Sequence, residues 1–315
     1  MRGRLILVWA LLAVGCGSTG LALATSAGQY PLGRGTGGCR VFPANNAWHE
    51  KVADLPVSPL SGQYIAAIGA GLDLHPDFGH ERAYGIPYAV VPASQPKVAI
   101  HFTAYGDQSD PGPYPIPPGA PIEGGQNASG DRHVIVLQAG TCRLYELWEA
   151  SQNADGSWNA GSGAVFNLRS NKLRPNGWTS ADAAGLSIFA GLIRYDEIQR
   201  GVIDHAIRFT APQTQAGFIH PATHFASSST NPNLPPMGLR LRLKASFDIS
   251  HFPRVARIIL RAMKTYGLIL ADNGSPWYFQ GATDPRWNDT ALDTLKTVPA
   301  GAFEVVQTGP ILHTG

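Results

Sequence analysis

The 315-residue sequence is poor in cysteine, methionine and charge: it contains three Cys, three Met and only 15% charged residues. It has no G-x-S-x-G pattern, no G-x-x-x-x-G-K-[ST] pattern, and no G-x-G-x-x-G after a predicted strand. The common serine-hydrolase, nucleotide-phosphate and dinucleotide sites are therefore not indicated, and we expect no cofactor. By contrast, the chain has 36 Gly and 25 Pro, which predict many turns and few long helices.

The small excess of positive charge comes from the N-terminus. The whole chain has 24 Lys and Arg against 22 Asp and Glu. Residues 1–24 contribute Arg2 and Arg4 and no acidic residue, so the remaining sequence is balanced. A balanced chain gives no electrostatic reason to expect a nucleic-acid partner.

The N-terminal segment predicts export from the cytoplasm. Arg2 and Arg4 precede an apolar run over 5–14, and Ala22-Leu23-Ala24 fits a signal-cleavage site. That run is about half of the roughly 20 apolar residues needed to span a membrane. We therefore expect no transmembrane span and a secreted or cell-surface protein. Ala13-Val-Gly-Cys16 also resembles a lipoprotein box, so a lipid anchor at Cys16 is an alternative to soluble secretion.

The rest of the chain divides into two parts. We expect residues 25–38, which contain five Gly, to form a flexible leader, and 39–315 to form a single β-rich globular domain. If Cys16 is removed with the signal or acylated, Cys39 and Cys142 remain. An even pair of cysteines in an oxidising compartment predicts a disulfide, and neither has a second Cys or His at metal-ligand spacing.

Hydrophobic residues recur mostly with a period of two. Apolar and polar residues alternate over 98–103, 133–137, 203–209 and 239–244, which predicts strands. Residues 132–138 and 143–149 flank a short turn and predict a hairpin. One clear helix is expected from Pro253 to Gly267, with shorter ones at 62–69, 180–185 and 289–296. The expected fold is mainly β, an antiparallel β-sandwich or jelly roll with a few packed helices.

Three segments carry a resemblance to other sequences: Gly130-Asp-Arg-His133, the stretch from Trp178 to Gly185, and the stretch from Lys264 to Gly274. Through them the chain resembles a group of exported bacterial proteins. The resemblance spans most of the mature chain and implies export and a single domain. It brings no activity with it.

Acidic residues gather around the proline-rich stretch 110–121 and the predicted hairpin. If the hairpin closes around residues 139 and 140, His133 lies opposite Glu146. Two carboxyl groups facing each other, one protonated and one ionised, are what glycoside hydrolysis requires. We therefore predict Glu146 as proton donor and Glu123 or Asp131 as base or nucleophile, with His133 beside them. Asp110 is a further candidate for contacting substrate. The alternative for these acids is that they cap turns.

Aromatic and histidine side chains supply the other candidates. Trp178 and Trp277 are predicted to stack on sugar rings, although tryptophans near loops often complete a core; the other candidates are Trp148, Trp158 and Trp287. His205 and His224 are predicted to bind substrate, with Arg208 on the same strand as the former. His220 and His224 share a spacing seen in zinc sites, but no Glu follows the first, and we predict no metal site.

These patterns predict a secreted carbohydrate-active enzyme, in the first place a glycoside hydrolase with a carboxylate pair and a polysaccharide or oligosaccharide substrate. One alternative is a polysaccharide lyase, in which His and Arg act on a uronate; Arg240, Arg242 and Lys244 would extend its basic face. Another is a non-catalytic surface protein that binds glycan through its aromatic residues. Asp77 and Asp272 are predicted loop carboxylates that line a cleft or form turns.

Overall fold

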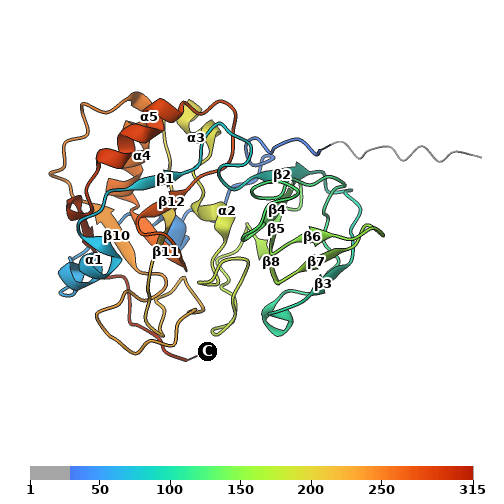
Figure 1. Cartoon of the computed structure of the whole chain (residues 1–315), viewed down its shortest axis with the longest axis horizontal. Coiled ribbons are helices and arrows are strands. Elements are labelled where there is room, and N and C mark those ends of the chain that lie inside the picture. Colours follow the sequence, from blue (N-terminus) through green and yellow to red (C-terminus); the bar gives the residue numbers. More distant parts are fainter. Residues whose placement is uncertain (1–28, 315) are drawn as a thin grey trace, which may run out of the picture.

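The computed structural model describes residues 29–314 and consists mainly of strands, arranged in three sheets with few helices (Figure 1). The predicted export signal, 1–24, and the predicted lipid-anchor residue Cys16 lie outside the described residues. Within 29–314, no helix has the length and apolar character needed to cross a membrane.

A six-stranded mixed sheet forms the larger half of the molecule. Its strands, in spatial order, are β1 (His75–Asp77), β12 (Tyr278–Gln280), β9 (Ile207–Ala211), β11 (Leu268–Asn273), β10 (Arg240–Leu243) and β13 (Phe303–Val305). The β1/β12 and β9/β11 pairs are parallel, and the other pairs are antiparallel. Helices α1 (Ser61–Gly69), α4 (Arg254–Thr265) and α5 (Asp289–Asp293) accompany this sheet.

The α4 helix confirms the helix predicted from Pro253 to Gly267. Its apolar face, which includes Ile259 and Met263, is buried in the main core. Gly267 follows the helix at φ 75°, and a Cβ atom there would lie 2.1 Å from the carbonyl oxygen of Leu241. Glycine is therefore required where the chain leaves α4 and turns into β11.

The smaller half contains two further sheets. A four-stranded sheet has the order β2 (Tyr88–Val91), β4 (Val134–Gln138), β5 (Arg143–Trp148) and β8 (Ser162–Asn167); a three-stranded sheet has the order β3 (Ile100–Phe102), β7 (Trp158–Ala160) and β6 (Ser151–Gln152). Strand β4 is buried on both faces. Ile135 and Leu137 join the main core, whereas Val134 and Val136 join a second core with Trp158.

The prediction of purely antiparallel sheets is wrong in detail, and a sandwich is not confirmed. The β2/β4 and β3/β7 pairs are parallel, so every sheet is mixed. Alternation of apolar residues locates a strand but says nothing of its neighbour's direction. The helix expected at 180–185 is also absent. There the Ser180 hydroxyl accepts from the backbone N–H of Asp182, which is the local bonding that competes with helix formation.

The disulfide and the hairpin are confirmed. Cys39 and Cys142 are bonded across 103 residues of sequence and tie the N-terminal arm to the turn between β4 and β5. The hairpin register pairs Ile135 with Glu146. The expected register, with His133 opposite Glu146, was therefore two residues off: the two share a face but lie diagonally.

The described part of the predicted leader, 29–38, is anchored to the domain. The backbone N–H of Tyr30 donates to the carbonyl of Gly119, and that of Gly33 donates to the carbonyl of Tyr88. These residues therefore extend along β2. Two further α-helices are short: α2 (Ile188–Gly191), which lies between the two halves in Figure 1, and α3 (Tyr195–Arg200).

Candidate functional site

Five carboxylates surround one hollow of the molecule, which we call the acidic pocket. It consists of two adjoining cavities of about 230 and 170 Å³ that share Asp131, Asp272 and Asn273. The acidic, histidine and arginine residues that line it are Asp77, Glu123, Asp131, His133, Asp182, Arg208, His224 and Asp272. They come from β1, β9 and β11, from the loops around β4 and before α2, and, in the case of His224, from the loop between β9 and β10. The parallel strands β9 and β11 both end at this pocket, as strands do at many ligand sites.

A β-bulge in β11 directs Asp272 into the pocket. The register of β11 against β9 is regular up to Leu270 and then shifts, so that Asp272 pairs with Thr210 and Ala271 is the extra residue. Such bulges re-aim the next side chain. Burial, and then the nearby Asp182 carboxylate, raise the pKa of Asp272 to about 7, although Arg208 opposes the shift. A carboxyl group at this position therefore keeps its proton close to neutral pH.

Asp182 and Arg208 form a buried ion pair behind Asp272. Nε and Nη2 of Arg208 lie 3.2 and 3.1 Å from Oδ2 of Asp182, and both side chains are almost fully buried. The second oxygen, Oδ1, has no hydrogen-bond partner among the described residues. Burial raises the pKa of Asp182, while the Arg208 charge partly offsets that rise. The Arg208 guanidinium thus lies at the floor of the pocket, with its charge compensated by Asp182.

Glu123 and His133 form a second ion pair. Nδ1 of His133 lies 2.6 Å from Oε2 of Glu123, and its Nε2 lies 3.0 Å from the carbonyl oxygen of Ala181. Both ring nitrogens thus face acceptors, which suits the imidazolium. Burial disfavours that charged form, but the Glu123 carboxylate outweighs it and raises the pKa of His133 to about 9. Burial would raise the pKa of Glu123, but the His133 charge and hydrogen bonds lower it overall. Glu123 is therefore ionised at neutral pH.

Aromatic rings form one wall of the pocket. Nε1 of Trp148 donates to Oδ1 of Asp131 at 3.1 Å, which fixes the indole beside that carboxylate. The ring of Tyr105 lies 6.1 Å from the Trp148 ring and is 41% exposed. Flat, partly exposed rings beside carboxylates are suitable surfaces for stacking an amphipathic ring.

His224 lines the same part of the pocket as Trp148. Its Nδ1 lies 2.7 Å from the carbonyl oxygen of Ala183, so this nitrogen carries the proton and donates. Burial lowers the pKa of His224. At neutral pH the ring is therefore neutral, and Nε2 holds a lone pair that can accept a proton or a hydroxyl hydrogen bond.

Glu146, the predicted proton donor, is not among the residues that line the acidic pocket. Its side chain is fully buried, and it accepts hydrogen bonds from the Ser187 hydroxyl and from the backbone N–H groups of Ile188 and Phe189, at 2.9 to 3.0 Å. These are N-terminal groups of α2. Glu146 therefore fixes α2 to strand β5, as a helix-capping carboxylate does.

Replacing Glu146 by Gln is expected to destabilise the protein by about 1–3 kcal/mol, because one backbone N–H then faces an amide donor instead of an acceptor. The free energy of unfolding in urea measures this loss. Glu149→Gln, a change at an exposed residue just after β5, is the matched control and should stay within about 0.5 kcal/mol of wild type. A variant of Glu146 with unchanged stability would contradict the capping role.

Four predicted residues lie elsewhere. Oδ2 of Asp110 is 2.5 Å from Nη1 of Arg174, and the Trp178 ring packs on the same guanidinium, in a groove outside the acidic pocket.

His205 is buried and its Nε2 lies 3.0 Å from Oε1 of Glu197. Trp277 is fully buried in the core, and its Nε1 donates to the carbonyl of Gly69. Among the described residues, neither His205 nor Trp277 lines the acidic pocket or the groove that contains Asp110, so their predicted substrate-binding roles gain no support.

Of the sequence candidates, Glu123, Asp131, His133 and His224 do meet in the acidic pocket. Sequence reasoning missed Asp182 and the role of Arg208. Asp272 was noted only as a carboxylate in a cleft or turn. The feature that could have identified it is the Asp-Asn-Gly sequence at the end of an apolar strand, a common pattern where a strand ends at a site.

Among the described residues, no group of three or more His, Cys, Asp or Glu side chains is arranged to hold a metal ion. Comparison with family models, with curated proteins and with solved structures finds no match to this chain.

Proposed function

We propose that the chain is an exported carbohydrate-active enzyme that hydrolyses glycosidic bonds in the acidic pocket. One observation carries the proposal: a single cavity combines Asp272, which keeps its proton near neutral pH, with Glu123, which is ionised. Glycoside hydrolysis needs such a division between two carboxyl groups. The disulfide is compatible with an extracellular protein.

In this proposal Asp272 is the proton donor. It protonates the glycosidic oxygen as the bond from that oxygen to the anomeric carbon breaks, and the leaving sugar departs with a hydroxyl group. Glu123 or Asp131 stabilises the positive charge on the sugar, either as nucleophile or as the base that takes a proton from the attacking water. Water supplies the hydroxyl to the anomeric carbon. In the nucleophile route Asp272 takes its proton back from that water, and in the base route Asp272 is reprotonated from solvent while the base releases the water's proton.

The remaining walls of the pocket support a sugar ligand. Trp148 and Tyr105 offer ring faces for the apolar side of a sugar. Gln280 lines the same cavity as Asp272, and its buried Oε1 has no partner among the described residues. A buried amide oxygen without a partner is costly, and a sugar hydroxyl is a suitable donor for it.

The test is release of reducing sugar from a panel of plant and microbial polysaccharides. Wild type is expected to act on at least one of them. Glu123→Gln and Asp131→Asn are then compared, and the variant that loses activity identifies the ionised partner of Asp272. Glu81→Gln, an exposed change outside the pocket, is the control and should keep full activity. No release by wild type, together with binding of a glycan, would favour the non-catalytic binding alternative.

A lyase is the second candidate, and the state of His224 favours it. Its neutral ring presents Nε2 as a base, and Arg208 lies in the adjoining cavity as a cation for a uronate carboxylate. A lyase removes the proton next to that carboxylate and expels the glycosidic oxygen, which leaves an unsaturated product. Ultraviolet absorbance of the product distinguishes the two reactions. Under the hydrolase proposal no such absorbance develops with any uronate polymer.

A further inference from the structure

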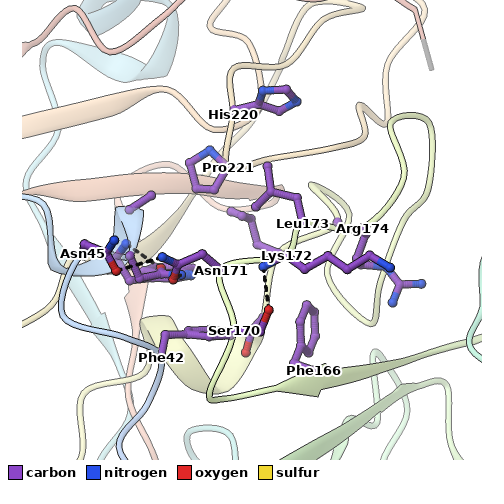
Figure 2. A pocket seen from close by; sticks show the side chains of 16 residues that line it. Phe42, Asn45, Phe166, Ser170, Asn171, Lys172, Leu173, Arg174, His220 and Pro221 are labelled. Atoms are coloured by element: carbon purple, nitrogen blue, oxygen red, sulfur yellow. Dashed lines mark hydrogen bonds between the residues drawn. The ribbon is translucent and has the colours of Figure 1, made fainter.

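A second hollow, which we call the basic groove, lies outside the acidic pocket. It consists of two cavities of about 270 and 630 Å³ that share Phe42, Phe166, Lys172 and Arg174 among their lining residues. Figure 2 shows the smaller cavity, with Asn45 and Asn171 at one side and Phe166, Lys172 and Arg174 at the other. Its size is within the range of small-ligand sites.

Positive charge dominates the groove. Arg143, Lys172 and Arg174 line it, and Asp110 is the one carboxylate among its lining residues. Asp110 is already neutralised by Arg174, whose guanidinium also donates to the carbonyls of Gln108 and Thr179. Lys172 and Arg143 are exposed, and neither side chain forms an ion pair or hydrogen bond with another described residue. Two cationic groups are thus free to meet a ligand.

The rest of the lining is suited to sugar rings. Phe166 and Trp178 both pack against the Arg174 guanidinium, which lies 5.9 and 5.6 Å from their ring centroids. This arrangement holds both rings at the groove. An amide chain runs along the opposite side: Nδ2 of Asn46 donates to Asn171, and Nδ2 of Asn171 donates to Oδ1 of Asn45. The Asn45 amide ends that chain at an exposed position.

We propose that the basic groove binds an acidic oligosaccharide, with Lys172 and Arg143 contacting its carboxylates. A chain of uronate sugars matches all three features, since it carries one negative charge per ring, an apolar ring face and hydroxyl groups. A nucleic acid fits less well, because Lys172 and Arg143 are only two free cations for a polyphosphate backbone, and the whole chain has little net charge. The site is separate from the acidic pocket and goes beyond the proposed hydrolysis.

The test is titration of the full chain with a short oligogalacturonate, and with its methyl-esterified form of equal length as the neutral control. Binding is expected for the acid and not for the ester, and it should weaken as salt is added. Lys172→Met and Arg143→Gln are each expected to reduce affinity about tenfold, as for loss of one charge-assisted hydrogen bond. Lys97→Met, an exposed change outside the groove, should leave affinity unchanged.

Two further measurements make the outcome decisive. Asp272→Asn should bind the oligogalacturonate as wild type does, so failure of the hydrolase proposal and failure of this one remain distinguishable. Equal binding of acid and ester, no binding of either, full affinity in the Lys172/Arg143 double variant, or tighter binding of a single-stranded oligonucleotide would each overturn the proposal. Both substitutions are at exposed positions, and unchanged melting temperatures verify that the variants are folded.

Discussion

Asp272→Asn is expected to lower kcat by about 10²–10⁴-fold, the contribution of a positioned general acid. The change is nearly isosteric, and an asparagine at this position retains the oxygen that accepts from the backbone N–H of Asn273, 2.7 Å away. The fold should therefore survive. The measurement is the rate of reducing-sugar release from whichever polysaccharide wild type cleaves.

The activity of wild type is expected to fall at both high and low pH, through the two carboxyl groups. The pKa of Asp272 is raised to about 7, so the proton it donates is lost, and activity falls, as pH rises through that value. The pKa of Glu123 is lowered below its ordinary value of 4.5, so the acidic loss of activity should lie below that pH. Wild type should be active between these limits. Asp272→Asn should lack the alkaline limb, because the group that titrates there is gone.

Stability should move in the opposite direction from activity. A carboxyl group whose pKa is raised in the folded state opposes folding once pH rises above its unfolded pKa, and this penalty is complete above about pH 7. Asp272→Asn removes it, so its melting temperature at pH 8 should equal or exceed that of wild type. Asp54→Asn, an exposed change, is the control. Full activity in a folded Asp272→Asn variant would remove Asp272 from the mechanism.

The parts of the fold that could be predicted are those encoded locally. The α4 helix combines a 3.6-residue apolar period with a glycine at its end, and the β4/β5 hairpin combines alternation with a short turn; both are found. The disulfide followed from counting cysteines. Strand direction was not predictable, because partners such as β9 and β11 are far apart in sequence and nothing local records their pairing.

The site was predicted only in part for a related reason. Glu123, Asp131 and His133 are close in sequence to one hairpin, so local reasoning could group them. Asp272 and Arg208 reach the same pocket only because β9 and β11 pair in parallel and β11 bulges at Ala271. By sequence, Glu146 is a catalytic candidate because it is a carboxylate on the same hairpin. Its burial depends on α2, which the sequence pattern did not indicate.

The buried pair of Asp182 and Arg208 supports the second large prediction. Arg208 is 3% exposed and Asp182 is 1% exposed, and the guanidinium is the only cation in contact with that carboxylate among the described residues. Removing one partner of a buried ion pair leaves the other charge without compensation, which is much more costly than losing an exposed pair. Arg208 also lies near Glu123 and Asp272, whose pKa values its charge lowers.

Arg208→Met is therefore expected to destabilise the protein by about 3–5 kcal/mol at neutral pH, measured as the free energy of unfolding. Because Asp182 can take up a proton, the loss of stability should shrink as pH falls below the raised pKa of that carboxyl.

Arg200→Met is the control: Arg200 is 53% exposed and 3.5 Å from Asp196, so its loss should cost no more than about 1 kcal/mol. Adding Asp182→Asn to Arg208→Met should restore part of the stability, since the uncompensated charge is then absent. Equal losses for Arg208→Met and Arg200→Met, or no recovery in the double variant, would show that this pair does not hold the floor of the acidic pocket.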